Sequence, residues 1–328
     1  MPTTYEYIAQ NKRRTVLLVL LFPLTFALLA GVTGGLLFWW LGPAEPASTS
    51  GFSQAQSNFL TALVCIIPLG WVVAIAWMFI SFFYGDKWLM NGAQAIFVTR
   101  RDQPEIYRLV ENLCITRGLP LPRIYIMDDD SLNAFATGRD PQHASLALTK
   151  GIVKKLERVE LEGVIAHELA HIENRDIRLM LLIVAGISFF TLAGEWCLRM
   201  ALFSRRSNSK ENSGTFLWLV AGIVCSVYGY LIAPLIRLAV SRRREYQADA
   251  TAALTTRNPR ALARALAKIS EDPRIEALDK CESMAAMCIE SPLAKAGLFS
   301  YLSGLIATHP PVKKRIEVLL EMDKEVTC

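Results

Sequence analysis

The stretch VIAHELAHIENRD, Val164 to Asp176, places two of the chain's four histidines four positions apart around a glutamate. From Lys150 to Asp176 apolar residues recur every three or four positions without a proline, a pattern that predicts a helix. Four residues turn a helix by about 400°, so His167 and His171 project from nearly the same face. Two imidazoles placed in this way are able to share one metal ion.

Glu168 lies about 100° further round the predicted helix than His167, within reach of a water on that ion but outside its ligands. The pattern HExxH divides the work accordingly: two neutral nitrogens hold Zn²⁺, and the adjacent carboxylate takes a proton from the attacking water. The motif therefore predicts a hydrolytic site with one zinc ion per chain and Glu168 as its base. The alternative is an ordinary helix with surface histidines.

A catalytic zinc site needs a third protein ligand, which must come from another element. The segment SRRREYQADA, Ser241 to Ala250, offers Glu245 and Asp249 four positions apart. We assign Glu245 as the third ligand and Asp249 as an acceptor that orients a ligand histidine through its other ring nitrogen. The alternative is a solvated helix end whose three arginines anchor a membrane boundary.

Two apolar runs of membrane-spanning length, Val16–Leu41 and Leu60–Tyr84, precede the motif. The first is longer than the apolar part of a signal peptide, so we expect an uncleaved anchor. Residues 12–14 are basic, whereas the connection Gly42–Asn58 has no Lys or Arg. The positive-inside rule then places Gly85–Arg178 in the cytoplasm.

A second apolar pair, Ile177–Gly194 and Phe216–Leu235, predicts a helical hairpin and brings the expected number of spans to about four. Glu195 and Arg199 are spaced to pair at the end of its first member. The connecting stretch Ser204–Gly214 carries basic residues, which conflicts with placing it outside. A re-entrant or protein-packed hairpin therefore stays open as an alternative.

The polar parts of the chain predict a small sheet and several helices. The segments PRIYIM (Pro122–Met127), NAFATG (Asn133–Gly138) and ASLALT (Ala144–Thr149) read as strands between turns. The segment Asn258–Asp272 begins with a capping asparagine and a proline and has one apolar face, so we expect a helix there. The fold class is therefore α+β and mainly helical.

Composition excludes several function classes. The 35 basic and 30 acidic residues are interspersed, so nothing favours nucleic-acid binding. The seven cysteines lack CxxC spacing and indicate reduced thiols rather than a disulfide framework. The apolar runs are nearly free of charge, which argues against a transporter. No phosphate-binding loop is present.

Five motifs in order, NAFATG, ALTKGI, LEGVIAHELAHIENRD, SRRREYQADA and THPP, resemble the HtpX family of membrane-bound zinc metalloproteases, which is related to the CAAX prenyl proteases of type 1. The resemblance covers about residues 85 to 320. It implies a gluzincin-like catalytic domain on the cytoplasmic side of a bacterial inner membrane. It also implies an endopeptidase of membrane or misfolded proteins.

The resemblance assigns roles to matched residues. It implies zinc ligands at His167, His171 and Glu245, a base at Glu168, a supporting Asp249, and positions near the cleft for Asn133 and His309. We expect an exposed edge strand at Asn133–Thr137, in which Asn133, Ala134, Phe135 and Ala136 pair with an extended substrate. The alternative is an ordinary strand between turns. His309 is expected to stabilise the oxyanion or to pack at a helix entrance.

We divide the chain into a transmembrane hairpin (1–84), a first catalytic part with the HExxH helix (85–176), a second apolar hairpin (177–236) and a C-terminal part with the third ligand (237–328). Two functional alternatives remain. One is a protease that processes prenylated proteins. The other is a zinc-containing membrane sensor or scaffold that cleaves nothing; such a structural site has no use for a carboxylate at Glu168.

Overall fold

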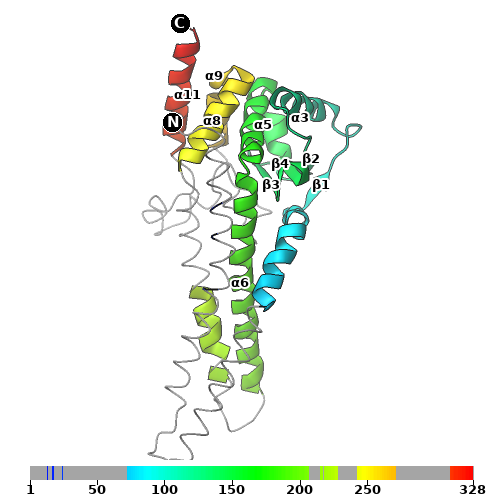
Figure 1. The fold of residues 1–328 in the computed structure, drawn as a ribbon, viewed down its shortest axis with the longest axis vertical. Helices are drawn as coiled ribbons and strands as arrows, with labels where there is room; N and C mark the ends of the chain where they lie inside the picture. The colour runs from blue at the N-terminus through cyan, green and yellow to red at the C-terminus, as the bar shows by residue number, and fades with distance from the viewer. Residues whose placement is uncertain are drawn as a thin grey trace, which may run out of the picture. The chain divides into compact units, whose positions relative to one another are not determined.

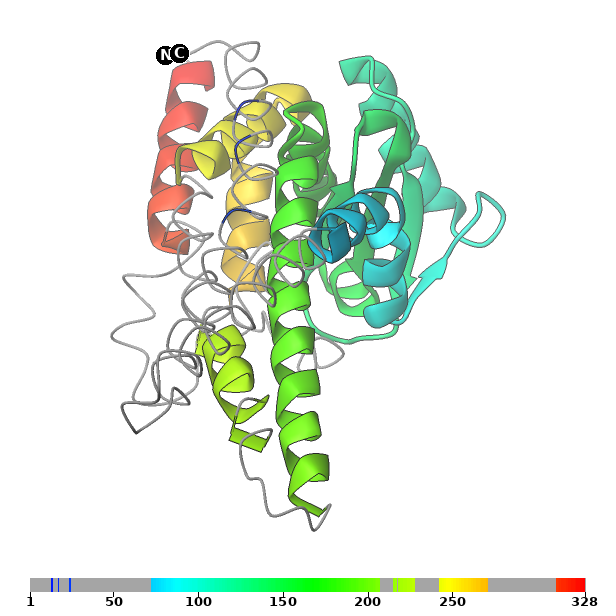
Figure 2. The ribbon, with the colours of Figure 1, turned by 60° about the horizontal axis from the view of Figure 1, so that its bottom comes forward.

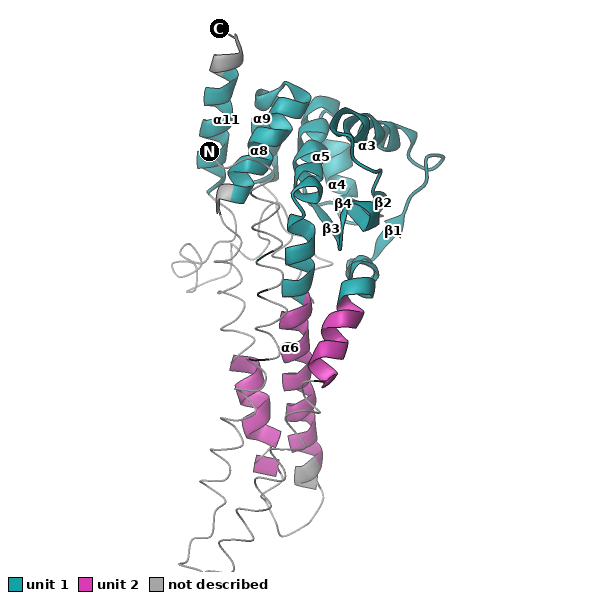
Figure 3. Ribbon diagram, in the orientation of Figure 1, with its two compact units in different colours: residues 1–14, 82–184, 234–328 teal, residues 15–81, 185–233 magenta. Residues whose placement is uncertain are grey.

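The computed structural model describes residues 13, 17, 24, 72–206, 215, 216, 218–227, 242–270 and 311–327. The chain forms two compact units (Figure 3). Unit 1 comprises Met1–Arg14, Phe82–Val184 and Pro234–Cys328, and unit 2 comprises Thr15–Ser81 and Ala185–Ala233. The predicted run Val16–Leu41 and His309 lie outside the described residues, apart from Leu17 and Leu24.

Unit 1 contains a four-stranded sheet in the order β1-β2-β4-β3 (Figure 1). Strand β2 (Arg123–Met127) is parallel to β4 (Ala144–Thr149), and β3 (Ala134–Gly138) is antiparallel to β4. The three predicted strands are confirmed. The fourth, β1 (Ala95–Phe97), pairs antiparallel with β2 and is too short to show an alternating pattern.

Strand β3 is an edge strand, as expected, but the expectation that it is exposed is wrong, because all five of its residues are buried. Ala134 and Ala136 belong to the core cluster that includes the apolar residues of α5 (Arg158–Glu173). Phe135 packs on the other face with a second cluster that includes Met90. Because successive side chains point to opposite faces, the two clusters bury both faces of this strand.

The helix predicted over Lys150–Asp176 is divided into three. Helix α4 (Lys150–Lys155) and α5 are separated at Glu157, whose side chain and that of Glu160 form a reciprocal capping box. Because such a box satisfies the free N–H groups of a new first turn, it starts a second helix here. Helix α5 ends at Asn174, and Arg175 has a left-handed φ of 59° before α6 (Asp176–Arg206) begins.

Helix α5 is the central element of unit 1. The sheet and α3 (Pro104–Arg117) lie on one side of it, and α8 (Arg242–Thr256), α9 (Pro259–Ile269) and α11 (Val312–Thr327) lie on the other (Figures 1 and 2). A Cβ on Gly163 would be 3.2 Å from Leu262 Cα, so a glycine permits the close approach of α9 to α5. Asn258 caps α9 as predicted, accepting a hydrogen bond from Ala261 N at 3.1 Å.

The buried carboxylate of Glu160 joins α5 to α9. We expect Glu160→Ala to lower the free energy of unfolding by about 1–3 kcal/mol at pH 7, because it removes the contacts of this carboxylate. Its oxygens accept hydrogen bonds from Lys268 Nζ at 2.7 Å, Arg264 Nε at 3.4 Å and Glu157 N at 2.9 Å. Burial raises the pKa of Glu160, but these donors outweigh that effect and lower it.

Because the pKa of Glu160 is lower in the folded state, its carboxylate stabilises the protein at any pH above the unfolded-state pKa of about 4.3. This stabilisation is lost as the pH falls through the folded-state pKa. The difference between wild type and Glu160→Ala should therefore shrink below pH 4 in denaturant unfolding experiments. Glu321→Ala, at an exposed position on α11, is the control and should change little. An equal loss for Glu160→Ala at pH 7 and pH 3 would contradict the assignment.

Among the described residues, two helices are long and apolar enough to cross a membrane, Val72–Gly92 and Asp176–Phe203, and Trp218–Val227 is a shorter apolar helix. About four spans were expected. The described residues contain two helices that meet the length and composition for a span. The span predicted to end at Tyr84 continues as helix to Gly92.

Within unit 2, the two members of the predicted second hairpin pack side by side as far as the structure describes them. A Cβ on Gly194 would be 2.8 Å from Ser226 Oγ, and one on Gly222 would be 2.8 Å from Leu198 Cδ2. Small residues thus let the two helices approach closely. The predicted pair of Glu195 and Arg199 is confirmed, with Oε2 and Nη2 3.5 Å apart.

Candidate metal centre

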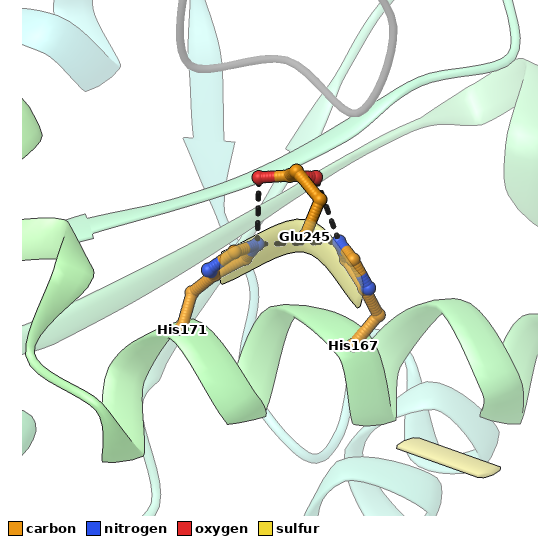
Figure 4. Close-up of side chains that lie close together, drawn as sticks. All are labelled: His167, His171 and Glu245. Atoms are coloured by element: carbon orange, nitrogen blue, oxygen red, sulfur yellow. Dashed lines mark hydrogen bonds and ion pairs between the residues drawn. The ribbon is translucent and has the colours of Figure 1, made fainter. Parts of the chain in front are cut away.

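His167, His171 and Glu245 converge on one point in unit 1 (Figure 4). Both histidines project from α5, one turn apart, and Glu245 reaches them from α8. The two Nε2 atoms are 3.2 Å apart. Glu245 places Oε2 3.7 Å from His167 Nε2 and Oε1 3.7 Å from His171 Nε2. The sequence prediction that these three side chains meet agrees with this geometry.

Small side chains allow the two ligand helices to lie close together. On α8, Ala248 and Ala252 are completely buried, and on α5 Ala166 and Ala170 are almost so. Buried alanines on both helices are compatible with a close approach, and Glu245 reaches from α8 to the histidines of α5. Glu245 lies in the first turn of α8 and is itself buried.

The three donors fit a divalent ion such as zinc. Tetrahedral coordination with metal–nitrogen bonds of roughly 2.0–2.1 Å requires two nitrogens about 3.3 Å apart, close to the 3.2 Å between the Nε2 atoms of His167 and His171. One ligand atom from each of the three residues lies within 4.8 Å of the others. Two imidazoles and one carboxylate are also the donor set of known catalytic zinc sites, which leave one position open.

Each ligand histidine has a buried carboxylate at its other ring nitrogen. Asp249 Oδ1 is 3.0 Å from His167 Nδ1, and Asp176 Oδ2 is 3.0 Å from His171 Nδ1. The first contact agrees with the expectation that Asp249 orients a ligand histidine through its other ring nitrogen. The second contact is one that the sequence did not predict. The left-handed Arg175 redirects the chain, which brings Asp176 back to the ring.

Arg315 is a completely buried residue of α11 that sequence reasoning missed. Its Nε and Nη2 donate to Asp249 Oδ2 and Oδ1 at 2.8 and 2.7 Å, and Nη1 lies 3.8 Å from Glu245 Oε2. A signal was available in the sequence: Arg315 occupies the same helical face as Val312, Ile316 and Leu319, which is otherwise apolar.

The charges around the site favour a cation. Burial lowers the pKa of His171, but hydrogen bonding and charge from Asp176, with the charges of Glu245 and Glu168, raise it to about 9. Burial raises the pKa of Asp249, but the Arg315 guanidinium and the bonds to Arg315 and His167 lower it to about 2. The carboxylates that favour a protonated imidazole would equally favour a bound metal ion.

Glu168 is buried next to the ligands, with 3% of the residue exposed. Its charge is among those that raise the pKa of His171 and of Arg315. Of the expected substrate-binding residues, Asn133 and Ala134 are completely buried at the start of β3, where Asn133 N donates to Thr149 Oγ1 at 3.1 Å.

A mainly helical chain whose HExxH helix is joined by a distant glutamate has the donor set of a metalloprotease, and two of its described helices are long and apolar enough to cross a membrane. The model of peptidase family M48 matches residues 100–323, and the chain belongs to this family.

Curated relatives agree with this assignment over nearly the whole chain. A protease HtpX homolog of Bacteroides fragilis (strain YCH46) is 41% identical over 315 residues, which cover 95% of this chain and 96% of the relative. A protease HtpX homolog of Tropheryma whipplei (strain Twist) is 37% identical over 326 residues, 98% of this chain and 99% of the relative. The resemblance to HtpX proteases is thereby confirmed.

Among solved structures, Ste24p of S. mikatae is similar to this chain, with 21% sequence identity and a TM-score of 0.47. The similarity covers 80% of this chain and 59% of that protein.

Proposed function

We propose that this protein is a zinc metalloendopeptidase that cleaves membrane or misfolded proteins at the cytoplasmic face of a bacterial inner membrane. The observation that carries the proposal is the meeting of His167, His171 and Glu245 beside the buried Glu168. These three side chains would hold one zinc ion per chain. When bound, zinc supplies a Lewis acid for a water molecule and for the scissile carbonyl.

The chain's own residues would perform the proton transfers. Glu168, the neighbour of His167 on α5, would accept the proton of the attacking water and then deliver it to the leaving amide nitrogen. Asp249 and Asp176 would hold the ligand imidazoles in one orientation through Nδ1, since both carboxylates lie 3.0 Å from that atom. We propose His309 as the group that stabilises the oxyanion.

Substrate binding is proposed at Asn133, Ala134, Phe135 and Ala136. Strand β3 is an edge strand of the described sheet, and an edge strand can pair with an extended peptide of almost any sequence. Such tolerance suits a protease of misfolded proteins. Because the residues of β3 are buried, a substrate would have to displace the groups that cover this edge. A cytoplasmic site is supported by the basic residues 12–14 before the first apolar run and their absence from Gly42–Asn58.

A proteome digestion tests this function. The detergent-solubilised full-length protein, with zinc, is incubated with a bacterial membrane proteome, and new peptide termini are identified by mass spectrometry. We expect many new termini in membrane proteins, none of which form with Glu168→Gln. Cleavage of a prenylated peptide without any such termini would favour the prenyl-processing alternative. Identical termini with both proteins would indicate a contaminating protease.

A further inference from the structure

The two ligand histidines are each the first member of a chain of three side chains, all of which are buried except the partly exposed His171. On one side, His167 Nδ1 meets Asp249, which Arg315 holds with two hydrogen bonds of 2.7 and 2.8 Å. On the other side, His171 Nδ1 meets Asp176, to which Arg244 Nη1 donates at 3.0 Å.

The arginines come from the elements that surround α5. Arg244 precedes the ligand Glu245 on α8, and its partner Asp176 is the first residue of α6. Arg315 comes from α11 and holds Asp249 of α8. Both arginines are nearly inaccessible, with 4% of Arg244 and 1% of Arg315 exposed. Burying a guanidinium is costly unless it is paired and hydrogen-bonded, and each of these two is paired with an aspartate that contacts a ligand histidine.

A neutral imidazole carries one hydrogen on its two nitrogens. The nitrogen without this hydrogen has the lone pair that can bind a metal. A carboxylate only accepts hydrogen bonds, so Asp176, which is hydrogen-bonded to His171 Nδ1 at 3.0 Å, keeps the hydrogen on that nitrogen. Asp249 Oδ1, 3.0 Å from His167 Nδ1, favours the same arrangement there. Both Nε2 atoms then carry lone pairs for the ion, and Arg315 Nη2 lies 3.5 Å from that of His167. An aspartate can keep the hydrogen on Nδ1 only while it stays ionised and does not rotate.

We propose that Arg244 and Arg315 are positioning residues that fix Asp176 and Asp249, and through them the two ligand histidines, in the geometry that binds the metal. The inference rests on the proposed zinc site. The His–Asp–Arg chains join α5 to the start of α6, to α8 and to α11, so metal affinity also depends on α6 and α11, which supply none of the three ligands.

The matched control is Arg117, which forms a two-bond ion pair with Glu173 at the end of α5, with Nε–Oε2 and Nη2–Oε1 distances of 3.0 and 2.7 Å. This pair has the same two-bond geometry as that of Arg315 and Asp249 and joins α3 to the last residue of the ligand helix α5, but its side chains are 31% and 21% exposed. A merely structural arginine should therefore behave like Arg117.

The experiment measures zinc affinity, not proteolysis. Full-length wild type, Arg244→Met, Arg315→Met and Arg117→Met are stripped with a chelator and titrated with zinc against a competing fluorescent chelator. We expect Arg244→Met and Arg315→Met to bind zinc about 10- to 100-fold more weakly and to alter the visible spectrum of the cobalt-substituted site. Arg117→Met should stay within about twofold of wild type. Wild-type affinity and spectrum in both site variants, or equal weakening in all three, would overturn the proposal.

Two further variants cover the case in which Arg315→Met does not fold. Arg315→Lys keeps the charge but cannot make the two-pronged contact with Asp249, so we expect zinc affinity to stay about 10-fold or more below wild type. The double variant Asp249→Asn/Arg315→Met removes both buried charges and should fold. Wild-type zinc affinity in this folded double variant would overturn the role of Arg315.

The same titration separates this inference from the proposed function. Folded wild-type protein that binds no zinc would overturn both. Tight zinc binding by the wild type together with unchanged binding by Arg244→Met and Arg315→Met would overturn the positioning role alone.

Discussion

Glu168→Gln should abolish proteolysis while one zinc ion per chain stays bound. Glutamine keeps the size of the side chain on α5 but cannot accept the proton of the attacking water. General acid–base catalysis contributes roughly 10²–10⁴-fold to a rate, so we expect activity to fall by at least about 10³-fold because one group serves both proton transfers. Fluorogenic peptide cleavage and metal analysis of the same purified sample measure both quantities.

The control for this experiment is Glu162→Gln on the same helix. Glu162 is about 1.7 turns before Glu168, is partly exposed, and is assigned no role in the site. Its substitution should leave both cleavage and zinc content near wild type. Proteolysis by Glu168→Gln at the wild-type rate would remove the assignment of the base and revive the sensor or scaffold alternative.

Glu245→Gln should lose the metal, and activity with it. The site would retain two imidazoles, and the positive Arg315, whose Nη1 lies 3.8 Å from Glu245 Oε2, would no longer be offset by the ligand carboxylate. We expect zinc affinity to fall by more than about 100-fold, the upper limit for loss of an outer partner of a ligand.

Metal content after dialysis against a weak chelator, together with unfolding temperature with and without zinc, measures this effect. Wild type should be stabilised by zinc because an ion that binds only the folded state shifts the equilibrium toward it. Glu245→Gln should not respond. Glu317→Gln, at an exposed position of α11, serves as the control. Full zinc content in Glu245→Gln would mean that another residue completes the site.

The ligands could be predicted because most of their geometry is local. His167 and His171 face one side whenever the HExxH segment is helical, and the helix follows from the apolar spacing around it. Predicting Glu245 required a second inference. The polar helix that follows the last apolar run had to pack against the HExxH helix. The structure brings these side chains together.

The partners of these ligands depend on contacts distant in sequence or on single dihedral angles. Arg315 is 66 residues from Asp249, and the spacing within α11 only marks it as an arginine on an apolar face. Asp176 reaches His171 because Arg175 adopts φ 59°, which a continuous helix over Lys150–Asp176 would not allow. Helix α3 was not predicted, and the number of spans and the four-part division of the chain remain predictions.

The central claim is that one divalent ion sits between His167, His171 and Glu245, and anomalous X-ray scattering at the zinc absorption edge tests it most directly. Crystals of the zinc-loaded protein should show one peak per chain, about 2.0–2.2 Å from both Nε2 atoms and from an oxygen of Glu245. A peak bound by other residues, or no peak between these three side chains in protein that cleaves peptides, would contradict the account.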